Sequence, residues 1–217
     1  MPVRKRDILL LDLDGTLVDP APGIIGSCRH ALERMGAPVG GDVDLRWIIG
    51  PPLRTSFAKL LDGRGDAEEA LQFYRERYAT WGLYEAKPYP EILEVLTKRP
   101  RDGAKLMLCT SKPQPFARRV VDHFGFAPLL SAVYGPDLDG RFDDKGDLIE
   151  HLLALEGPDP DQVCMVGDRE HDVRAAARHG IPTVGVLWGY GSRAELGGAG
   201  AEVLIESPHE LLGGHTQ

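Results

Sequence analysis

Two aspartates directly follow a short apolar run near the start of the chain. Residues 8–11 read Ile-Leu-Leu-Leu, and Asp12 and Asp14 come next, ahead of Gly15. An apolar run of this length that ends in a glycine turn is typical of a buried strand. The i, i+2 spacing places both carboxylates on the same side of an extended chain. Buried like charges need a cation or a shared proton, so the pair predicts a bound divalent metal, and oxygen ligands favour Mg²⁺.

The same segment has groups that can carry chemistry. One carboxylate can act as a nucleophile while its neighbour acts as an acid and base. Gly15 permits a sharp turn, and Thr16 offers a hydroxyl and an N–H group to an anion. The plain alternative is a strand followed by an acidic turn, in which Asp and Gly serve only the turn. The rest of the chain decides between these two interpretations.

Further along the chain, three more predicted element ends carry polar side chains. Apolar runs at 106–109 and 163–167 have the pattern of buried strands. An amphipathic helical pattern begins at Lys145, and another begins near Asp172. The polar residues at these ends are Thr110 with Ser111, then Lys145, then Asp168 with Asp172.

The order of these motifs resembles the haloacid dehalogenase superfamily of phosphohydrolases, and in particular its phosphoglycolate phosphatase-like branch. The resemblance covers essentially the whole chain. It implies that Asp12 is a nucleophile that forms an aspartyl-phosphate, and that Asp14 protonates the leaving alkoxide and then activates water. It further implies that Mg²⁺ is held by the Asp12 carboxylate, the Asp14 main-chain carbonyl and Asp168, with Asp172 next to the metal or its water.

The resemblance also implies a cradle for the phosphoryl group. Thr110 matches its hydroxyl, Lys145 its cation, and Ser111 can donate a main-chain N–H group. Gly146 follows Lys145 where many relatives have proline, so a surface ion pair is the alternative for this lysine. Lys112 is the other cation nearby, but its loop is expected to turn away from the site.

The predicted fold is α/β, with a Rossmann-like parallel sheet, helices on both faces and an inserted helical cap. Strand patterns lie at 7–12, 105–109, 131–135, 162–167, 182–187 and 202–205. Ligands of such sheets bind beyond the carboxyl ends of the strands, where the motifs fall. The core is expected at 1–18 and 88–217, and the cap at 19–87. Within the cap, Arg54 follows a Gly-Pro-Pro turn and is a candidate contact for the substrate.

These features predict a Mg²⁺-dependent phosphomonoester hydrolase with a small phosphorylated metabolite as substrate. Phosphoglycolate-like compounds, nucleotides and sugar phosphates stay open. The carboxylate at Asp14 argues against dehalogenases and phosphonoacetaldehyde hydrolases, which lack an acid there. Two alternatives remain: a phosphomutase of the β-phosphoglucomutase type, and a non-catalytic binding or regulatory protein on the same core.

Composition limits partners and compartment. A net charge of −8 makes a nucleic-acid polymer an unfavourable partner. The three cysteines fall in apolar patterns, which fits core positions in a reducing compartment. The first apolar run is too short for a signal sequence or a membrane span. We therefore expect a cytoplasmic monomer or homodimer that does not contact membranes.

Overall fold

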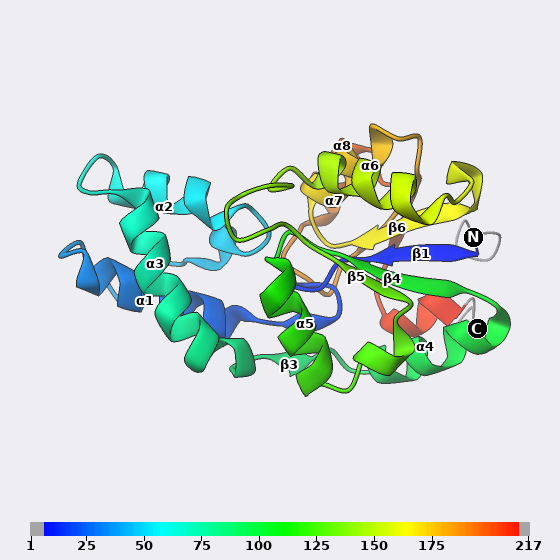
Figure 1. The fold of residues 1–217 in the computed structure, drawn as a ribbon, viewed down its shortest axis with the longest axis horizontal. Helices are drawn as coiled ribbons and strands as arrows, with labels where there is room; N and C mark the ends of the chain where they lie inside the picture. The colour runs from blue at the N-terminus through cyan, green and yellow to red at the C-terminus, as the bar shows by residue number, and fades with distance from the viewer. Residues whose placement is uncertain (1–6, 213–217) are drawn as a thin grey trace. The chain divides into compact units, whose positions relative to one another are not determined.

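A parallel β-sheet forms the centre of the larger part of the chain (Figure 1). The computed structural model describes residues 7–212, with the backbone alone at 101 and 102. Six strands pair in the order β5-β4-β1-β6-β7-β8, and each pairing is parallel. The predicted strands are confirmed, with ends displaced by at most one residue. They are β1 Ile8–Leu11, β4 Lys105–Cys109, β5 Ala132–Tyr134, β6 Val163–Gly167, β7 Thr183–Val186 and β8 Val203–Ile205.

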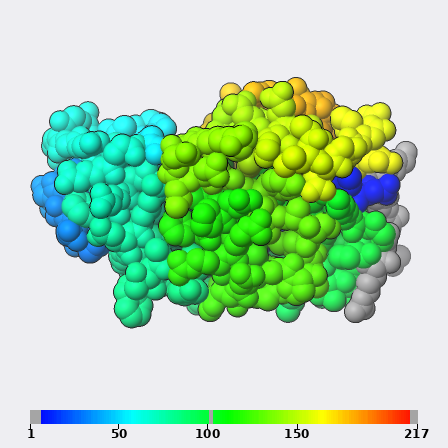
Figure 2. All heavy atoms as spheres, viewed as in Figure 1, coloured from blue at the N-terminus to red at the C-terminus, as the bar shows by residue number. Residues whose placement is uncertain are grey.

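Strand β1 lies in the middle of this sheet because its side chains are apolar on both faces. It pairs with β4 on one edge and β6 on the other, with Leu11 opposite both Leu108 and Val166. The dark blue atoms at the start of β1 lie among green and yellow atoms of much later segments (Figure 2). This register aligns the carboxyl ends of three neighbouring strands, so the residues that follow them meet.

Helices cover both faces of the sheet, as predicted. Helices α6 and α7 lie on one face, and α4 and α5 on the other (Figure 1). The face under α6 and α7 is a continuous apolar cluster that includes Leu10, Met107 and Met165 of the strands. The helices of this part are α4 Ile92–Lys98, α5 Gln114–His123, α6 Lys145–Glu156, α7 Glu170–Ala177 and α8 Arg193–Ala199.

The chain divides into two compact units, one of which is Pro20–Lys87 and the other the remainder. The smaller unit contains helices α1 Ala21–Arg34, α2 Leu53–Leu61 and α3 Ala67–Thr80. Asp66 caps α3, since its side chain accepts a hydrogen bond of 2.8 Å from the Glu68 N–H group. Two short strands, β2 Val18–Asp19 and β3 Lys87–Pro88, pair where the chain passes between the units. The sequence patterns did not predict these strands.

Aromatic side chains form the core of the smaller unit. Tyr74 stacks on Tyr78 with ring centroids 5.2 Å apart, and it meets Phe57 edge-on at 6.0 Å. In the sequence, Leu71, Tyr74, Tyr78 and Trp81 form an apolar stripe at helical spacing, which predicts that they lie in the core of this unit. For Trp81 that prediction is wrong, because its side chain is 67% exposed. Helix α3 ends at Thr80, so Trp81 leaves the helical spacing that placed the other aromatic residues inward. Within the described residues 7–212, no helix is both long and apolar enough to cross a membrane.

Candidate active site

The aligned strand ends bring the predicted polar residues to one edge of the sheet. Asp12 follows β1 and continues its ladder, since its N–H group donates to the Val166 carbonyl at 2.9 Å. Asp168 follows β6 and Thr110 follows β4. All three side chains are buried, Asp168 completely. Residues that are about a hundred and fifty positions apart in sequence therefore share one site because parallel strands end together.

Lys145 is the cation at the centre of this edge. Its ammonium group donates to Asp12 Oδ1 at 2.9 Å and also bonds Asp172 Oδ1. Burial lowers the pKa of Lys145, but the charges of Asp12 and Asp172 outweigh burial and raise it above its usual value. Asp144 caps the helix that carries Lys145, by accepting a 3.0 Å bond from the Asp147 N–H group. Lys145 is thus a buried, charged group and not a surface ion pair.

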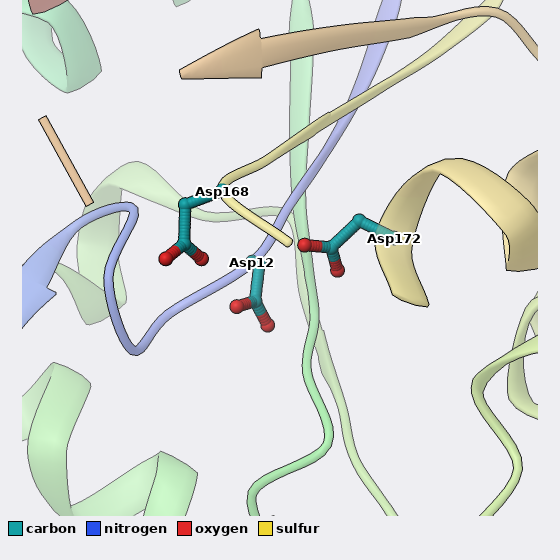
Figure 3. A group of neighbouring side chains, drawn as sticks. All are labelled: Asp12, Asp168 and Asp172. Atoms are coloured by element: carbon teal, nitrogen blue, oxygen red, sulfur yellow. The ribbon is translucent and has the colours of Figure 1, made fainter. Parts of the chain in front are cut away.

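Three buried carboxylates, two of which bond Lys145, lie close to one another. Figure 3 shows these side chains of Asp12, Asp168 and Asp172. Ligand atoms of Asp12, Asp168 and Asp172 all lie within 4.8 Å of one another. Burial raises the pKa of Asp168 well above its usual value, and the charges of Asp172 and Asp12 raise it further. Burial likewise raises the pKa of Asp172, against the opposing charge of Lys145.

This donor set fits a divalent cation. Three carboxylates against one ammonium leave excess negative charge in a buried place, which is costly unless a cation neutralises it. Burial is the main cause of the raised pKa values of Asp168 and Asp172, and the charges of neighbouring carboxylates add to it. Carboxylate oxygens suit a hard cation, so these residues could hold a metal. The Asp14 side chain lies outside this cluster of three.

The turn after Asp14 packs against Asp168. Gly15 has φ +84°, and a Cβ atom there would lie 2.2 Å from Asp168 Oδ2, so both conformation and space require glycine. Thr16 is fully buried, its hydroxyl lies 3.5 Å from Asp168 Oδ1, and its N–H group donates to the Leu13 carbonyl. The two groups of Thr16 that the sequence offered to an anion therefore have partners in the protein, the hydroxyl in Asp168 and the N–H group in Leu13.

Lys112 lies inside the site, contrary to the prediction that its loop turns away. Its ammonium group is 2.8 Å from Asp14 Oδ1, and both side chains are buried. The turn is made by Thr110, whose hydroxyl accepts a 3.2 Å bond from the Lys112 N–H group. Ser111 between them is partly buried. The signal that could have located Lys112 is the Thr-x-Lys-Pro sequence, because a threonine bonded to the residue two positions on reverses the chain.

A second group that the sequence did not assign is the loop from Trp188 to Gly191. The Tyr190 N–H group donates to Asp168 Oδ2 at 2.7 Å, and the Trp188 indole donates to the Thr16 carbonyl at 3.0 Å. A Cβ atom on Gly191 would lie 1.9 Å from the Asp168 carbonyl oxygen. In the sequence, the glycines at 189 and 191 predict a turn near the site, but only the structure shows that this turn orients Asp168.

The structure also shows the neighbours of Gly146 and Arg54, the two remaining positions discussed from the sequence. Gly146 leaves room for Arg178, since a Cβ atom at 146 would lie 2.3 Å from that guanidinium group. A larger residue at 146 would require the exposed Arg178 side chain to shift. Arg54 lies in the smaller unit and forms an ion pair with Glu68, with 34% of its side chain exposed.

The parallel sheet and the carboxylates at its central strand ends define an α/β enzyme core. A family model described as haloacid dehalogenase-like hydrolase matches residues 9–186. The chain therefore belongs to the haloacid dehalogenase-like hydrolases, and the resemblance seen in the sequence is confirmed.

Several known proteins are similar over most of the chain. A 5'-nucleotidase of Pseudomonas aeruginosa is 43% identical, over 87% of this chain and 86% of that protein. Tyrosine-protein kinase PtkA of Mycobacterium tuberculosis is 42% identical, over 88% of this chain but 65% of that protein. A phosphoglycolate phosphatase of Caulobacter vibrioides is 31% identical, over 92% of this chain and 86% of that protein. The crystal structure of a predicted phosphatase from Clostridium acetobutylicum superposes with a TM-score of 0.90 at 35% identity. The superposition covers 95% of this chain and 96% of that chain.

Proposed function

We propose that the protein is a Mg²⁺-dependent phosphomonoester hydrolase that works through a phosphorylated Asp12. The observation that carries this proposal is the contact of Lys145 with Asp12 at the centre of a buried carboxylate cluster. A nucleophilic carboxylate needs an adjacent cation to approach an anionic phosphoryl group. Asp12 has such a partner at 2.9 Å, and it directly follows the central strand β1, which is paired on both edges.

Each step then has a residue to perform it. An oxygen of Asp12 attacks phosphorus, and the bond from phosphorus to the ester oxygen breaks as Asp14 gives its proton to the leaving alkoxide. Asp14, now ionised, takes a proton from water as that water attacks the phosphorus of the phosphorylated Asp12. The bond between phosphorus and Asp12 breaks, inorganic phosphate leaves, and Asp14 is protonated again. Burial raises the pKa of Asp14, against the opposing charge of Lys112, which suits a carboxyl group that must carry a proton.

The remaining residues bind and orient the phosphoryl group. Lys145, the Thr110 hydroxyl and the Ser111 N–H group are the donors that we assign to its oxygens. We assign the metal to Asp12, Asp168 and the Asp14 carbonyl, with Asp172 beside them, and Gly15 as the turn that brings the loop over the phosphate. When bound, Mg²⁺ supplies positive charge that offsets repulsion between the phosphoryl group and the carboxylates.

A nucleoside 5'-monophosphate is the substrate class that we favour. The relative named 5'-nucleotidase is 43% identical, whereas the one named phosphoglycolate phosphatase is 31% identical, at similar coverage. Small sugar phosphates remain candidate substrates. In this assignment the unit Pro20–Lys87 acts as a cap that selects the substrate, and Arg54 is its candidate contact.

The relative named as a tyrosine-protein kinase raises a second possibility for the same intermediate. A phosphoryl group on Asp12 can pass to a tyrosine hydroxyl or to a sugar phosphate in place of water. The core residues are the same in each case, so the acceptor distinguishes the reactions. A protein without turnover on any donor would instead fit the non-catalytic alternative.

One experiment tests the main proposal. Phosphate release is measured over a panel of nucleoside monophosphates, phosphoglycolate, sugar phosphates and p-nitrophenyl phosphate, with Mg²⁺, with Ca²⁺ and with excess chelator. We expect turnover with Mg²⁺, little with Ca²⁺ because it prefers more ligands, and none with chelator. Full activity in excess chelator contradicts the proposal. Phosphate transfer to a peptide tyrosine or a sugar phosphate without release of inorganic phosphate would identify the other acceptors.

A further inference from the structure

The two catalytic aspartates that we assign have separate cations. Lys145 contacts Asp12, and Lys112 contacts Asp14, over 2.9 Å and 2.8 Å. Lys145 is also bonded to Asp172, so its position belongs to the carboxylate cluster. Lys112 comes from another part of the chain, between β4 and α5, and meets a side chain outside that cluster. The site therefore contains a second buried cation whose role the reaction described above leaves open.

The backbone of Lys112 is held in place from several sides. The Thr110 hydroxyl accepts its N–H group, and Pro113 follows it at the start of α5. Gly135 packs against its carbonyl group so closely that a Cβ atom at 135 would lie 2.4 Å from the oxygen. A lysine side chain loses much rotational freedom when it is buried, so a buried lysine on a fixed backbone is a rigid contact.

The contact between Lys112 and Asp14 depends on charge and position. Only 4% of the Lys112 side chain and 12% of the Asp14 side chain are exposed, so water screens the pair little. The ammonium group lies 2.8 Å from Oδ1, so the charge of Lys112 acts directly on the Asp14 carboxyl group. A buried ion pair of this kind restricts where the carboxyl group can lie.

We propose that Lys112 is a positioning residue that holds the Asp14 carboxyl group in place for proton transfer to and from the reacting oxygens. This inference rests on the proposed function, because it needs Asp14 to be the acid and base. Lys112 then acts through Asp14 and does not contact the transferred phosphoryl group. A lysine that bound the phosphoryl group directly would affect all substrates alike, whereas one that acts through Asp14 affects only the steps in which Asp14 moves a proton.

Leaving-group dependence separates these roles. The nitrophenolate of p-nitrophenyl phosphate leaves without a proton, whereas the alkoxide of AMP needs one. We measure kcat/KM, which reports the first chemical step, for both esters with the wild type, Lys112→Met and Lys112→Arg. We expect Lys112→Met to lose about 100-fold on AMP, within the usual range for an acid catalyst, and less than about 5-fold on p-nitrophenyl phosphate. Lys112→Arg keeps the charge but not the compact shape of the ammonium group. Its kcat/KM should fall less than that of Lys112→Met, and again more on AMP than on p-nitrophenyl phosphate.

Two controls complete the test. Lys105→Met removes a lysine that pairs with Glu156 at the other end of β4, and should leave both kcat/KM values near those of the wild type. In an Asp14→Asn background, Lys112→Met should add little further loss on AMP, because the residue through which it acts is gone. Melting temperatures show whether each variant is folded, and if Lys112→Met does not fold, the comparison rests on Lys112→Arg.

Equal losses on the two esters, or no loss on either, would overturn the positioning role of Lys112 while leaving the hydrolase assignment intact. A wild type that releases phosphate from none of the esters in the substrate panel with Mg²⁺ would instead overturn the proposed function. The two failures are therefore distinguishable. An additive loss in the double variant also counts against the inference, because it shows that Lys112 acts independently of Asp14.

Discussion

The main-chain N–H group of Tyr190 donates a 2.7 Å hydrogen bond to the Asp168 carboxylate. The phenolic O–H of the same residue bonds the Asp19 carboxylate, at the end of strand β2. One residue therefore connects a candidate metal ligand to the last core residue before Pro20. The two contacts can be tested separately, because a substitution of the Tyr190 side chain removes the bond to Asp19 and leaves the main-chain bond to Asp168 in place.

Tyr190→Phe should lower stability without weakening metal binding. Loss of a hydrogen bond to a charged, partly buried acceptor should lower the free energy of unfolding by about 1–2 kcal/mol, which urea denaturation measures. The affinity for Mg²⁺, measured by titration calorimetry, should stay within about twofold, because the N–H group that orients Asp168 is unchanged. Tyr134→Phe is the matched control, since its hydroxyl bonds Glu156 at 2.7 Å, away from the site. A large fall in Mg²⁺ affinity for Tyr190→Phe alone would mean that the side chain, too, orients Asp168.

Asp12→Asn should be folded and inactive. The amide keeps the shape of the side chain but is a poor nucleophile, so kcat should fall by at least about a thousandfold. Mass spectrometry of rapidly quenched wild-type enzyme should find a phosphoryl group on the peptide that contains Asp12, and none in the variant. Near-normal turnover of Asp12→Asn would rule out the covalent route.

Lys145→Ala should damage both activity and stability. Removal of a donor to the phosphoryl oxygens should reduce kcat by about 100- to 1,000-fold. Without metal, the variant also leaves two buried carboxylates, those of Asp12 and Asp172, without their ammonium partner, and we expect a loss of about 3–5 kcal/mol in the free energy of unfolding. Lys98→Ala is the control, because its exposed pair with Glu94 should contribute at most about 1 kcal/mol. Similar losses in both variants would contradict the central position of Lys145.

The stabilising effect of Mg²⁺ should increase with pH. In the metal-free protein the pKa values of Asp168 and Asp172 are raised above the usual 3.8, so their contribution to stability is full below that value. That contribution is lost as the pH rises through the raised pKa values, because the ionised carboxylates are then buried away from water and also repel one another. Mg²⁺ binds the ionised forms, so the gap in melting temperature between Mg²⁺ and chelator should widen from pH 5 to pH 8.

Asp168→Asn is the control for this pH effect, because the amide removes one titrating ligand. The variant should show a smaller gap in melting temperature with a weaker pH dependence. A gap of constant size in the wild type would show that protons and Mg²⁺ do not compete for these carboxylates.

Arg54→Ala tests substrate selection by the unit Pro20–Lys87. If Arg54 contacts the leaving-group side of the substrate, KM for the preferred nucleotide should rise about tenfold while KM for p-nitrophenyl phosphate changes little. Arg46→Ala is a matched control, since Arg46 forms an exposed pair with Asp44 in the same unit. If Arg54 only pairs with Glu68, neither KM will change and the variant will differ from the wild type in stability alone.

The sequence by itself determined the sheet and the positions of the main acids. The runs that became β1, β4 and β6 are apolar apart from Lys105 at the start of β4, which is the pattern of strands covered on both faces, and their ends are marked by Asp12, Thr110 and Asp168. Since parallel strands end at one edge, convergence of these residues follows from the pattern alone. The family resemblance rested on these same local signals.

The tertiary structure decided the contacts made by turns and loops. Lys112 reaches Asp14 because a threonine bond reverses the chain, and the amide of Tyr190 reaches Asp168 because a glycine-rich loop approaches it closely. Trp81 is exposed because its helix ends one residue earlier. Such contacts depend on where each loop lies against the rest of the core, and no periodicity in the sequence encodes that position. The apolar runs in the sequence therefore determine the strands and their ends, whereas tertiary packing determines which lysine contacts which carboxylate.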